Sequence, residues 1–165
     1  MRIRKARVEE LSKLLQIYDD ARKYMRAHGN AEQWNGGYPG KDVLLADIHK
    51  EALYVCTEDD ESEILGAFCY FEGIDPTYVN IYDGTWLNDR PYGVIHRIAV
   101  AVHQRGVASF CFDHCFSRCK NLKIDTHRDN IPMQRALEKN GFVRCGIIYL
   151  ENGAPRIAFQ RCVDQ

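Results

Sequence analysis

The sequence lacks any long apolar run. No stretch approaches the roughly 20 consecutive apolar residues that a membrane-spanning helix needs. Residues 1–5 are mostly basic and lead straight into an amphipathic pattern, which is unlike a signal peptide. We therefore expect a chain that is not exported, has no membrane partner and works in the cytoplasm.

An excess of charge of either sign is also missing, since the formal net charge is -1 at pH 7. Proteins that attract nucleic acid over long distances are usually strongly basic, so we expect no nucleic-acid partner. Hydrophobic residues make up 45% and charged residues 27%, which is typical of a folded globular chain. A length of 165 residues is typical of one domain, which we predict over residues 1–165.

The seven cysteines form no C-x-x-C pair, and their odd number disfavours a disulfide framework. Cys111, Cys115 and Cys119 recur every fourth residue near His114, a spacing that suggests a metal or redox site. The same spacing places them on one face of a helix, where free cysteine usually packs as a small hydrophobe. We favour the buried face and expect no metal cofactor.

The alternation of apolar and polar residues predicts a mixed α/β chain. Strands are expected at 2–7, 52–57, 64–71, 94–100, 122–125, 142–150 and 156–161, and helices at 11–25, 43–50, 106–116 and 130–140. Between 75 and 92 the sequence is irregular and aromatic, which predicts a long surface excursion.

One turn has the character of a phosphate site. A strand leads into a helix near Gly106, and the first N–H groups and the dipole of such a helix favour an anion. Gly106 and Ala108 allow a ligand to approach the backbone closely. His103 and Arg105 add positive charge, and Ser109 adds a hydroxyl. The pattern alone is weak, because many such junctions hold no ligand and it matches neither a dinucleotide fingerprint nor a P-loop.

Two segments carry a resemblance to a known family. The first is Ile95-His96-Arg97-Ile98-Ala99-Val100 followed by His103-x-x-Gly106-x-Ala108-Ser109. The second is Asn130-Ile131-Pro132-Met133 leading to Glu138-Lys139-Asn140-Gly141-Phe142. In this order they resemble the fourth strand, the [QR]-x-x-G-x-[GA] pyrophosphate loop and the N-x-P-A...E-K-x-G-F stretch of the GCN5-related N-acetyltransferase (GNAT) superfamily.

The resemblance implies a single GNAT-like α/β (α+β) domain. Its central sheet would be mixed, mostly antiparallel and of about seven strands, with a splay between the fourth and fifth and about four flanking helices. The implied activity is transfer of an acetyl group from acetyl-CoA, the expected co-substrate, to a primary amine that attacks the thioester directly. The implied cofactor-binding residues are Ile98, Ala99, Val100, His103, Gln104, Arg105, Gly106, Val107, Ala108, Ser109, Asn130 and Met133.

Three positions depart from the family pattern. The first loop position, usually Gln or Arg, is His103, and the glycine that usually follows is Gln104. The tyrosine that many members use as general acid corresponds to Leu137. A non-catalytic acyl-CoA-binding module or sensor on the same fold therefore stays open as the alternative function.

Proton transfer is needed because the attacking amine must be neutral. His96 lies on the expected strand 94–100, where alternation places it on one face with Val94, Ile98 and Val100. An imidazole suits a base near neutral pH. A lone histidine beside apolar residues is more often structural, so both interpretations stay open.

A second cluster, at the end of the expected strand 122–125, offers Asp125 and His127 as candidate catalytic groups. The same residues equally fit a polar cap on the next helix, with Asp129 or Asn130 at the N-cap. Tyr149 is a candidate for the missing acid, although tyrosine is also common in half-buried strands.

The acceptor is the part that the sequence leaves most open. Trp34, Tyr38, Tyr78 and Trp86 are candidates for a pocket that holds an ammonium or an apolar amine. They are equally able to pack the loops that carry them. We expect a small-molecule or peptide amine as the partner, and the sequence leaves open whether the chain forms a homodimer.

Overall fold

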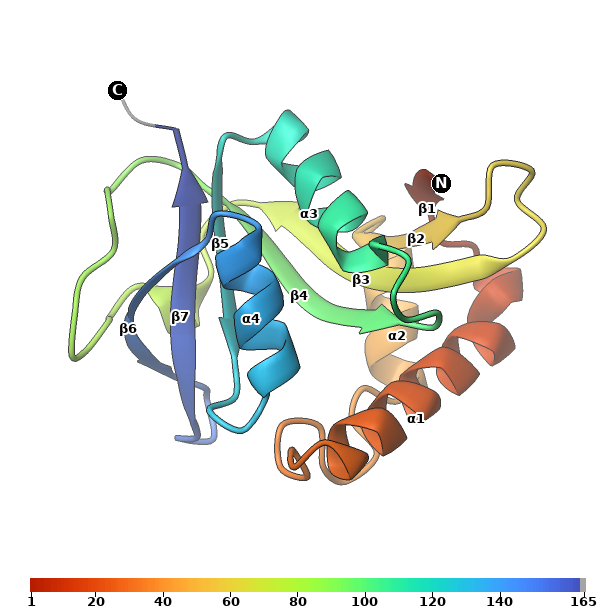
Figure 1. The fold of residues 1–165 in the computed structure, drawn as a ribbon, viewed down its shortest axis with the longest axis horizontal. Helices are drawn as coiled ribbons and strands as arrows, with labels where there is room; N and C mark the ends of the chain where they lie inside the picture. Colours follow the sequence, from red (N-terminus) through yellow and green to blue (C-terminus); the bar gives the residue numbers. More distant parts are fainter. Residues whose placement is uncertain (164–165) are drawn as a thin grey trace.

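The computed structural model describes residues 1–163 around a seven-stranded sheet with the order β1-β2-β3-β4-β5-β7-β6 (Figure 1). The strands are β1 (Arg2–Lys5), β2 (Leu53–Thr57), β3 (Ile64–Glu72), β4 (Gly93–Val100), β5 (Asn121–Thr126), β6 (Val143–Tyr149) and β7 (Pro155–Cys162). The helices are α1 (Leu11–Ala27), α2 (Lys41–His49), α3 (Val107–Arg118) and α4 (Ile131–Lys139), with short 3-10 helices η1 (Val8–Glu10) and η2 (Pro76–Tyr78).

The helices and strands predicted from the apolar pattern are all present, with small differences at their ends. Only β4 and β5 pair in parallel, and every other neighbouring pair is antiparallel. The predicted mixed, mostly antiparallel sheet in one α/β domain is therefore confirmed for the described residues.

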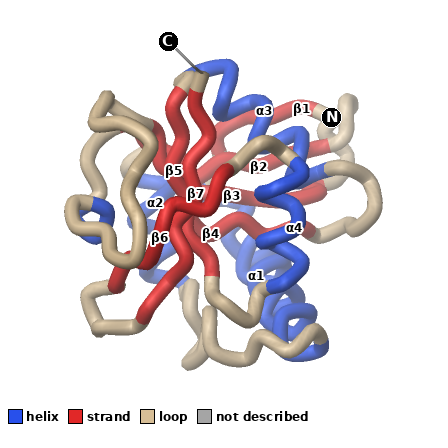
Figure 2. The backbone as a smooth tube through the Cα atoms, turned by 60° about the vertical axis from the view of Figure 1, so that its left-hand side comes forward, coloured by secondary structure: helices blue, strands red, loops and turns tan. Residues whose placement is uncertain are grey.

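Helices cover both faces of the sheet, and each face has its own core (Figure 2). Phe112 of α3 and Leu137 of α4 are fully buried in the first core with side chains of β3, β4, β5 and β7. Leu14 of α1 and Leu44 of α2 are fully buried in the second, against β2 and β3. The amphipathic stripes read from the sequence therefore bury their apolar sides against the sheet.

β4 and β5 run side by side only where both begin. Their ladder contains two pairs, Gly93 with Leu122 and Val94 with Lys123. Beyond these pairs β4 continues along β3 while β5 continues along β7, so the two strands diverge (Figure 1). The predicted splay is confirmed, and within residues 1–163 the β5-facing edge of β4 has no ladder partner after Val94.

A β-bulge interrupts β4 at Arg97. The register to β3 shifts there, and Arg97 takes a left-handed φ of 52°. The bulge places Ile98 in the core under α3 and α4, whereas His96 packs against Tyr78 on the opposite face. The prediction that His96 shares a face with Ile98 and Val100 is therefore wrong, because a period of two holds only in a strand without a bulge.

The segment between β3 and β4 is a largely exposed excursion, as predicted, but Asp75 and Tyr78 within it are buried. Tyr78 is 1% exposed in a third core cluster with Val94 and Ile148. The Trp86 indole donates to the Tyr78 carbonyl oxygen at 2.8 Å. Buried Tyr78 and half-buried Trp86 hold η2 against the sheet, and Asp75 at its N-cap therefore lies beside β4.

The cysteines have structural positions. Cys111 and Cys115 are buried on α3, Cys119 is half-buried at its C-cap, and all three are free. Among residues 1–163, no group of His, Cys, Asp and Glu side chains is arranged to hold a metal ion. In the same part of the chain, no helix has the length and apolarity needed to cross a bilayer.

Leu137 offers a test of the core under α3 and α4, since it is 0% exposed. Leu137→Ala removes buried carbon atoms and leaves a cavity, so we expect the free energy of unfolding in urea to fall by about 2–5 kcal/mol. The same change at Leu87, which is 48% exposed, should cost about 0.5 kcal/mol or less. Equal losses in the two variants would contradict the assigned core.

Candidate functional site

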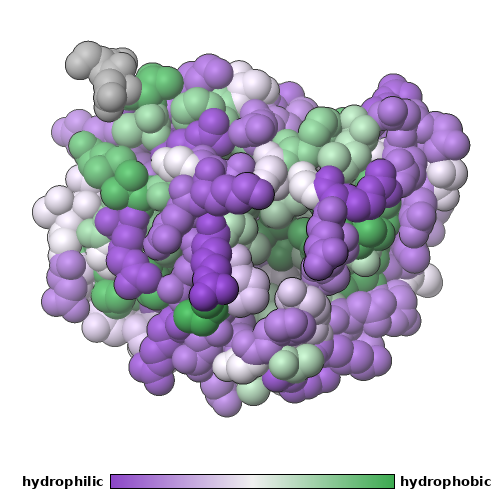
Figure 3. Space-filling view, in the orientation of Figure 1, coloured by the Kyte–Doolittle hydropathy of each residue, from purple (hydrophilic) through white to green (hydrophobic). Residues whose placement is uncertain are grey.

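Two adjoining cavities open where β4 and β5 diverge. The larger has a volume of about 870 Å³ and the smaller about 210 Å³. Met25, Ile98, Asn130 and Met133 line both, so the two cavities adjoin at these four residues and are together called the channel. Figure 3 shows a hollow near the middle of this face of the molecule, with hydrophilic side chains around it.

The smaller cavity lies against the turn between β4 and α3. Gly106 is the N-cap of α3 with a φ of 74°, and no side chain caps this helix. Gln104 stands where the family resemblance expects glycine, yet its φ is also positive, at 63°. The turn therefore keeps a left-handed geometry that favours glycine, and such turns aim successive N–H groups at an anion.

The space beside this turn is open to a ligand. A Cβ added to Gly106 would meet no atom within 4 Å. The neighbouring walls from Val102, Val107 and Met133 are apolar. An anion-binding turn next to an apolar channel fits a molecule with a phosphate at one end and an uncharged arm, as in acetyl-CoA.

Most of the residues predicted to bind the cofactor line this channel. They are Ile98, Ala99, Val100, His103, Gln104, Gly106, Val107, Ala108, Ser109, Asn130 and Met133. Arg105 lines neither cavity, because its guanidinium pairs with Glu58. The His103 ring stacks on Tyr24 with 4.1 Å between centroids. Burial, together with nearby His28, lowers the pKa of His103, which favours its neutral form.

His96 reaches the larger cavity from β4 and is held by Asp75. Its Nε2 lies 2.7 Å from Asp75 Oδ2, and Asp75 also accepts the Thr77 backbone N–H at 2.8 Å and hydroxyl at 2.7 Å. Burial by itself would raise the pKa of Asp75, but the hydrogen bonds from His96 and Thr77 outweigh it and lower the pKa. An ionised Asp75 can only accept a hydrogen bond, so in the neutral imidazole this contact places the proton on Nε2 and the lone pair on Nδ1.

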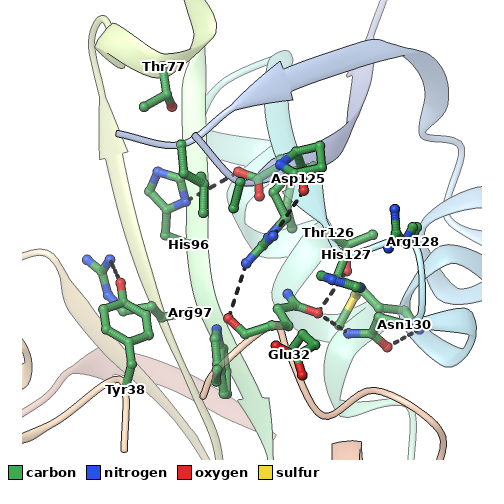
Figure 4. Close-up of a pocket in the computed structure, with 18 of the residues that line it drawn as sticks. Glu32, Tyr38, Thr77, His96, Arg97, Asp125, Thr126, His127, Arg128 and Asn130 are labelled. Carbon is green, nitrogen blue, oxygen red and sulfur yellow. Dashed lines mark hydrogen bonds and ion pairs between the residues drawn. The ribbon is translucent and has the colours of Figure 1, made fainter. Parts of the chain in front are cut away.

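Asp125 approaches the same imidazole from the end of β5. Its Oδ2 lies 4.0 Å from His96 Nδ1, which is too long for a hydrogen bond, and it accepts the Tyr78 hydroxyl at 2.6 Å. Burial and then the Asp125 charge raise the pKa of Tyr78 well above its usual range, so the phenol stays a donor. Figure 4 shows His96 and Asp125 on the two strands that border the cavity.

His127 also lines the larger cavity, but its Nδ1 is occupied. It accepts the backbone N–H of Asp129 at 2.9 Å. Burial and nearby Arg156 lower the pKa of His127. Asn130 is the N-cap of α4 and accepts the Met133 N–H at 3.2 Å. The capping interpretation of this segment is confirmed for Asn130, and His127 supports the same turn.

The aromatic candidates separate into two groups. Trp34 and Tyr38 line the larger cavity. Tyr78 is buried and lines neither cavity, but its hydroxyl donates to Asp125, which lines the larger one. Trp86 and Tyr149 line neither cavity, and Tyr149 is 46% exposed. Tyr149 is therefore not placed to supply the missing acid.

Three further residues belong to the site but were not predicted from the sequence. Gln33 Oε1 accepts the Asn130 side chain at 2.8 Å and ties the loop before α2 to α4. Asp75 holds His96, and Arg156 enters the larger cavity from β7. Asp75 could have been noticed because it precedes Pro76 in an N-capping pattern. No local signal marks Gln33 or Arg156, which reach the site only through the tertiary fold.

The sequence matches no family model, and its comparison with curated proteins gives no significant match. Solved structures do match. An acetyltransferase of the GNAT family from Streptococcus agalactiae 2603 is 28% identical with a TM-score of 0.89, over 99% of this chain and 96% of that one. A putative acetyltransferase from Staphylococcus aureus Mu50 is 22% identical with a TM-score of 0.70, over 99% and 100%.

A chain of the NatC complex bound to Gag peptide and CoA is more distant in sequence. It is 13% identical with a TM-score of 0.66, over 99% of this chain and 98% of that one. The agreement extends over almost the whole length in each case, so it concerns the complete sheet and its helices. The chain therefore has the GNAT fold, and its resemblance to the GNAT superfamily is confirmed.

Proposed function

We propose that this protein transfers an acetyl group from acetyl-CoA to a primary amine by direct attack of the neutral amine on the thioester. The observation that carries the proposal is the pair of adjoining cavities at the splay. An anion-binding turn at Gly106 lies at one end of it, and the His96–Asp75 pair lies at the other. The two ends meet at Ile98, Asn130 and Met133.

The cofactor would occupy the smaller cavity. Its pyrophosphate would be bound by the N–H groups at the start of α3, where the helix dipole also favours negative charge. Its pantetheine amides would pair with the backbone of Ile98 to Val100, the edge of β4 that β5 leaves free within the described residues. Unpaired strand edges bind extended groups in this way.

The acceptor amine would enter through the larger cavity. His96 Nδ1 carries a lone pair there and is the group best placed to take the proton of the amine. Asp75 fixes the tautomer and would stabilise the imidazolium that forms. Asp125, anchored by Tyr78, would attract the ammonium form of the acceptor and direct it to His96. The remaining rate enhancement would come from positioning.

The leaving CoA thiolate has no tyrosine placed to protonate it at the position where the family usually has one. Leu137, at the position of the family's usual tyrosine, is fully buried and lines neither cavity. A thiol has a pKa of about 8.5, so its thiolate leaves readily near neutral pH without a strong acid. The same leucine supports the second candidate, a non-catalytic acyl-CoA-binding module. Only an enzyme would release free thiol from acetyl-CoA when amines are added.

Gly106→Glu tests the cofactor site. The new carboxylate would project into open space beside the turn and repel the pyrophosphate, so we expect the acetyl-CoA affinity measured by calorimetry to fall by about 100-fold or more. Gly29→Glu is the matched control, since Gly29 has a φ of 84° and open space around it but lines neither cavity. Equal affinity in the two variants would place the cofactor elsewhere.

His96→Gln tests the base. The group that takes the proton of the amine must be unprotonated beforehand, so kcat/KM of the wild type should have an acid limb, a fall on acidification. The variant should lose about 100-fold or more in kcat/KM, and this acid limb should disappear while acetyl-CoA binding persists. Thiol release measured across pH gives both results.

His127→Gln and Asp125→Asn accompany this test. His127→Gln should keep the acid limb, because its Nδ1 serves the turn before α4. Asp125→Asn should mainly raise KM for the amine, since its proposed role is attraction of the ammonium. An acid limb that survives in His96→Gln and disappears in His127→Gln would reverse the assignment.

A further inference from the structure

Arg156 carries a buried charge that forms no ion pair among the described residues, although the nearby charge of Asp125 partly offsets the effect of burial on its pKa. It is 7% exposed and lines the larger cavity. Its guanidinium donates to two neutral acceptors, the Pro155 carbonyl oxygen at 3.0 Å and the Gln33 carbonyl oxygen at 3.2 Å. A guanidinium has five N–H donors in a fixed fork, so most of this fork has no partner from residues 1–163.

The other buried cations near the site differ in this respect. Arg97 forms a two-pronged pair with Asp47, at 2.8 and 2.9 Å. Lys123 lies over the rings of Trp86 and Tyr92, at 4.1 and 3.9 Å from their centroids. Arg97 is thus paired with a carboxylate and Lys123 faces two aromatic rings, although burial still lowers the pKa of Lys123 to about 8. Burial of a charge without such a partner is costly, which makes Arg156 the exception that calls for an external anion.

The fold places Arg156 on the same face of the sheet as Asp125, the group proposed to attract the ammonium. Asp125 is opposite Ala158 in the β5–β7 ladder, and Arg156 precedes Ala158 by two positions on β7. Side chains alternate between the two faces along a strand, so Arg156 and Asp125 extend from the same face of the sheet. Diagonal neighbours of this kind are about 7–8 Å apart. They form no ion pair, since no oxygen of Asp125 lies within 4.0 Å of the guanidinium in the described structure.

We propose that Arg156 binds a carboxylate of the acceptor, so that the acceptor is a small amine that also carries a carboxylate, such as a free amino acid. This inference rests on the proposed acetyl transfer. The carboxylate would meet the free N–H fork of Arg156 in a charge-assisted hydrogen bond. The amine of the same molecule would face Asp125 and His96, where its proton is taken. One cavity thus offers a cationic and an anionic subsite to the two ends of a zwitterion.

The test compares acids with their matched amides. Free amino acids, the corresponding amino-acid amides and dipeptides are offered with acetyl-CoA, and thiol release gives kcat and KM for each. The wild type should prefer the best amino acid to its amide by about 100-fold in kcat/KM, because the amide lacks the charge that Arg156 binds. Arg156→Gln should abolish this preference, with most of the loss in KM.

Arg128→Gln is the matched control, since Arg128 also lines the larger cavity but its side chain is exposed. It should keep the preference for the acid. Arg156→Lys retains the charge without the fork and should keep part of the preference, which separates binding from a folding defect. Calorimetry with acetyl-CoA confirms that each variant is folded, because Arg156 does not line the smaller cavity.

The possible results distinguish this inference from the function on which it rests. An amide or dipeptide that is acetylated as well as the amino acid, or a preference that survives in Arg156→Gln, overturns the carboxylate site while acetyl transfer stands. Acetyl-CoA binding without turnover of any carboxylate-bearing amine also overturns it. Absence of both acetyl-CoA binding and thiol release overturns the proposed function itself.

Discussion

The short parallel contact between β4 and β5 is the constraint on which the rest of this structure depends. Two residue pairs join the strands, and each strand then follows its other neighbour, β3 or β7. The gap becomes a channel because α1, α4 and the loop before α2 close its sides. Backbone that would have formed a ladder is left free, and the sheet interior becomes accessible without a break in the core.

The bulge at Arg97 adapts β4 to this gap. A left-handed φ is unfavourable for arginine, and three interactions hold it. Asp47 binds the guanidinium through two nitrogens, the Arg97 Nη1 donates to the Tyr38 hydroxyl, and the Tyr18 hydroxyl donates to the Arg97 carbonyl oxygen at 2.6 Å. The extra residue turns His96 toward Asp75 while Ile98 stays in the core. The face of β4 that carries His96 is thereby separated from the face that carries Ile98.

Much of the fold follows from local sequence, because amphipathic period and turn chemistry are local properties. The helices, the strands and the turn at Gly106 are predictable in this way, and the N-cap of α4 at Asn130 was one of two alternatives. The site is less predictable, since Asp75, Gln33 and Arg156 come from separate parts of the chain and meet only in the folded sheet. The bulge also makes the period-two prediction fail in β4, because no local sequence signal indicates that Arg97 has a left-handed φ. Two aromatic residues that the sequence offered as site candidates lie outside both cavities: Trp86 packs against Tyr78, and Tyr149 is exposed to solvent.

We propose above all that acetyl-CoA lies in the splay, with its thioester where the two cavities meet. A crystal structure with acetyl-CoA bound tests it most directly. We expect the pyrophosphate on the backbone N–H groups that follow Gly106, and the thioester between Ile98 and Asn130, within reach of an amine at His96 Nδ1. A cofactor bound outside this channel, or a thioester directed away from His96, would contradict the account.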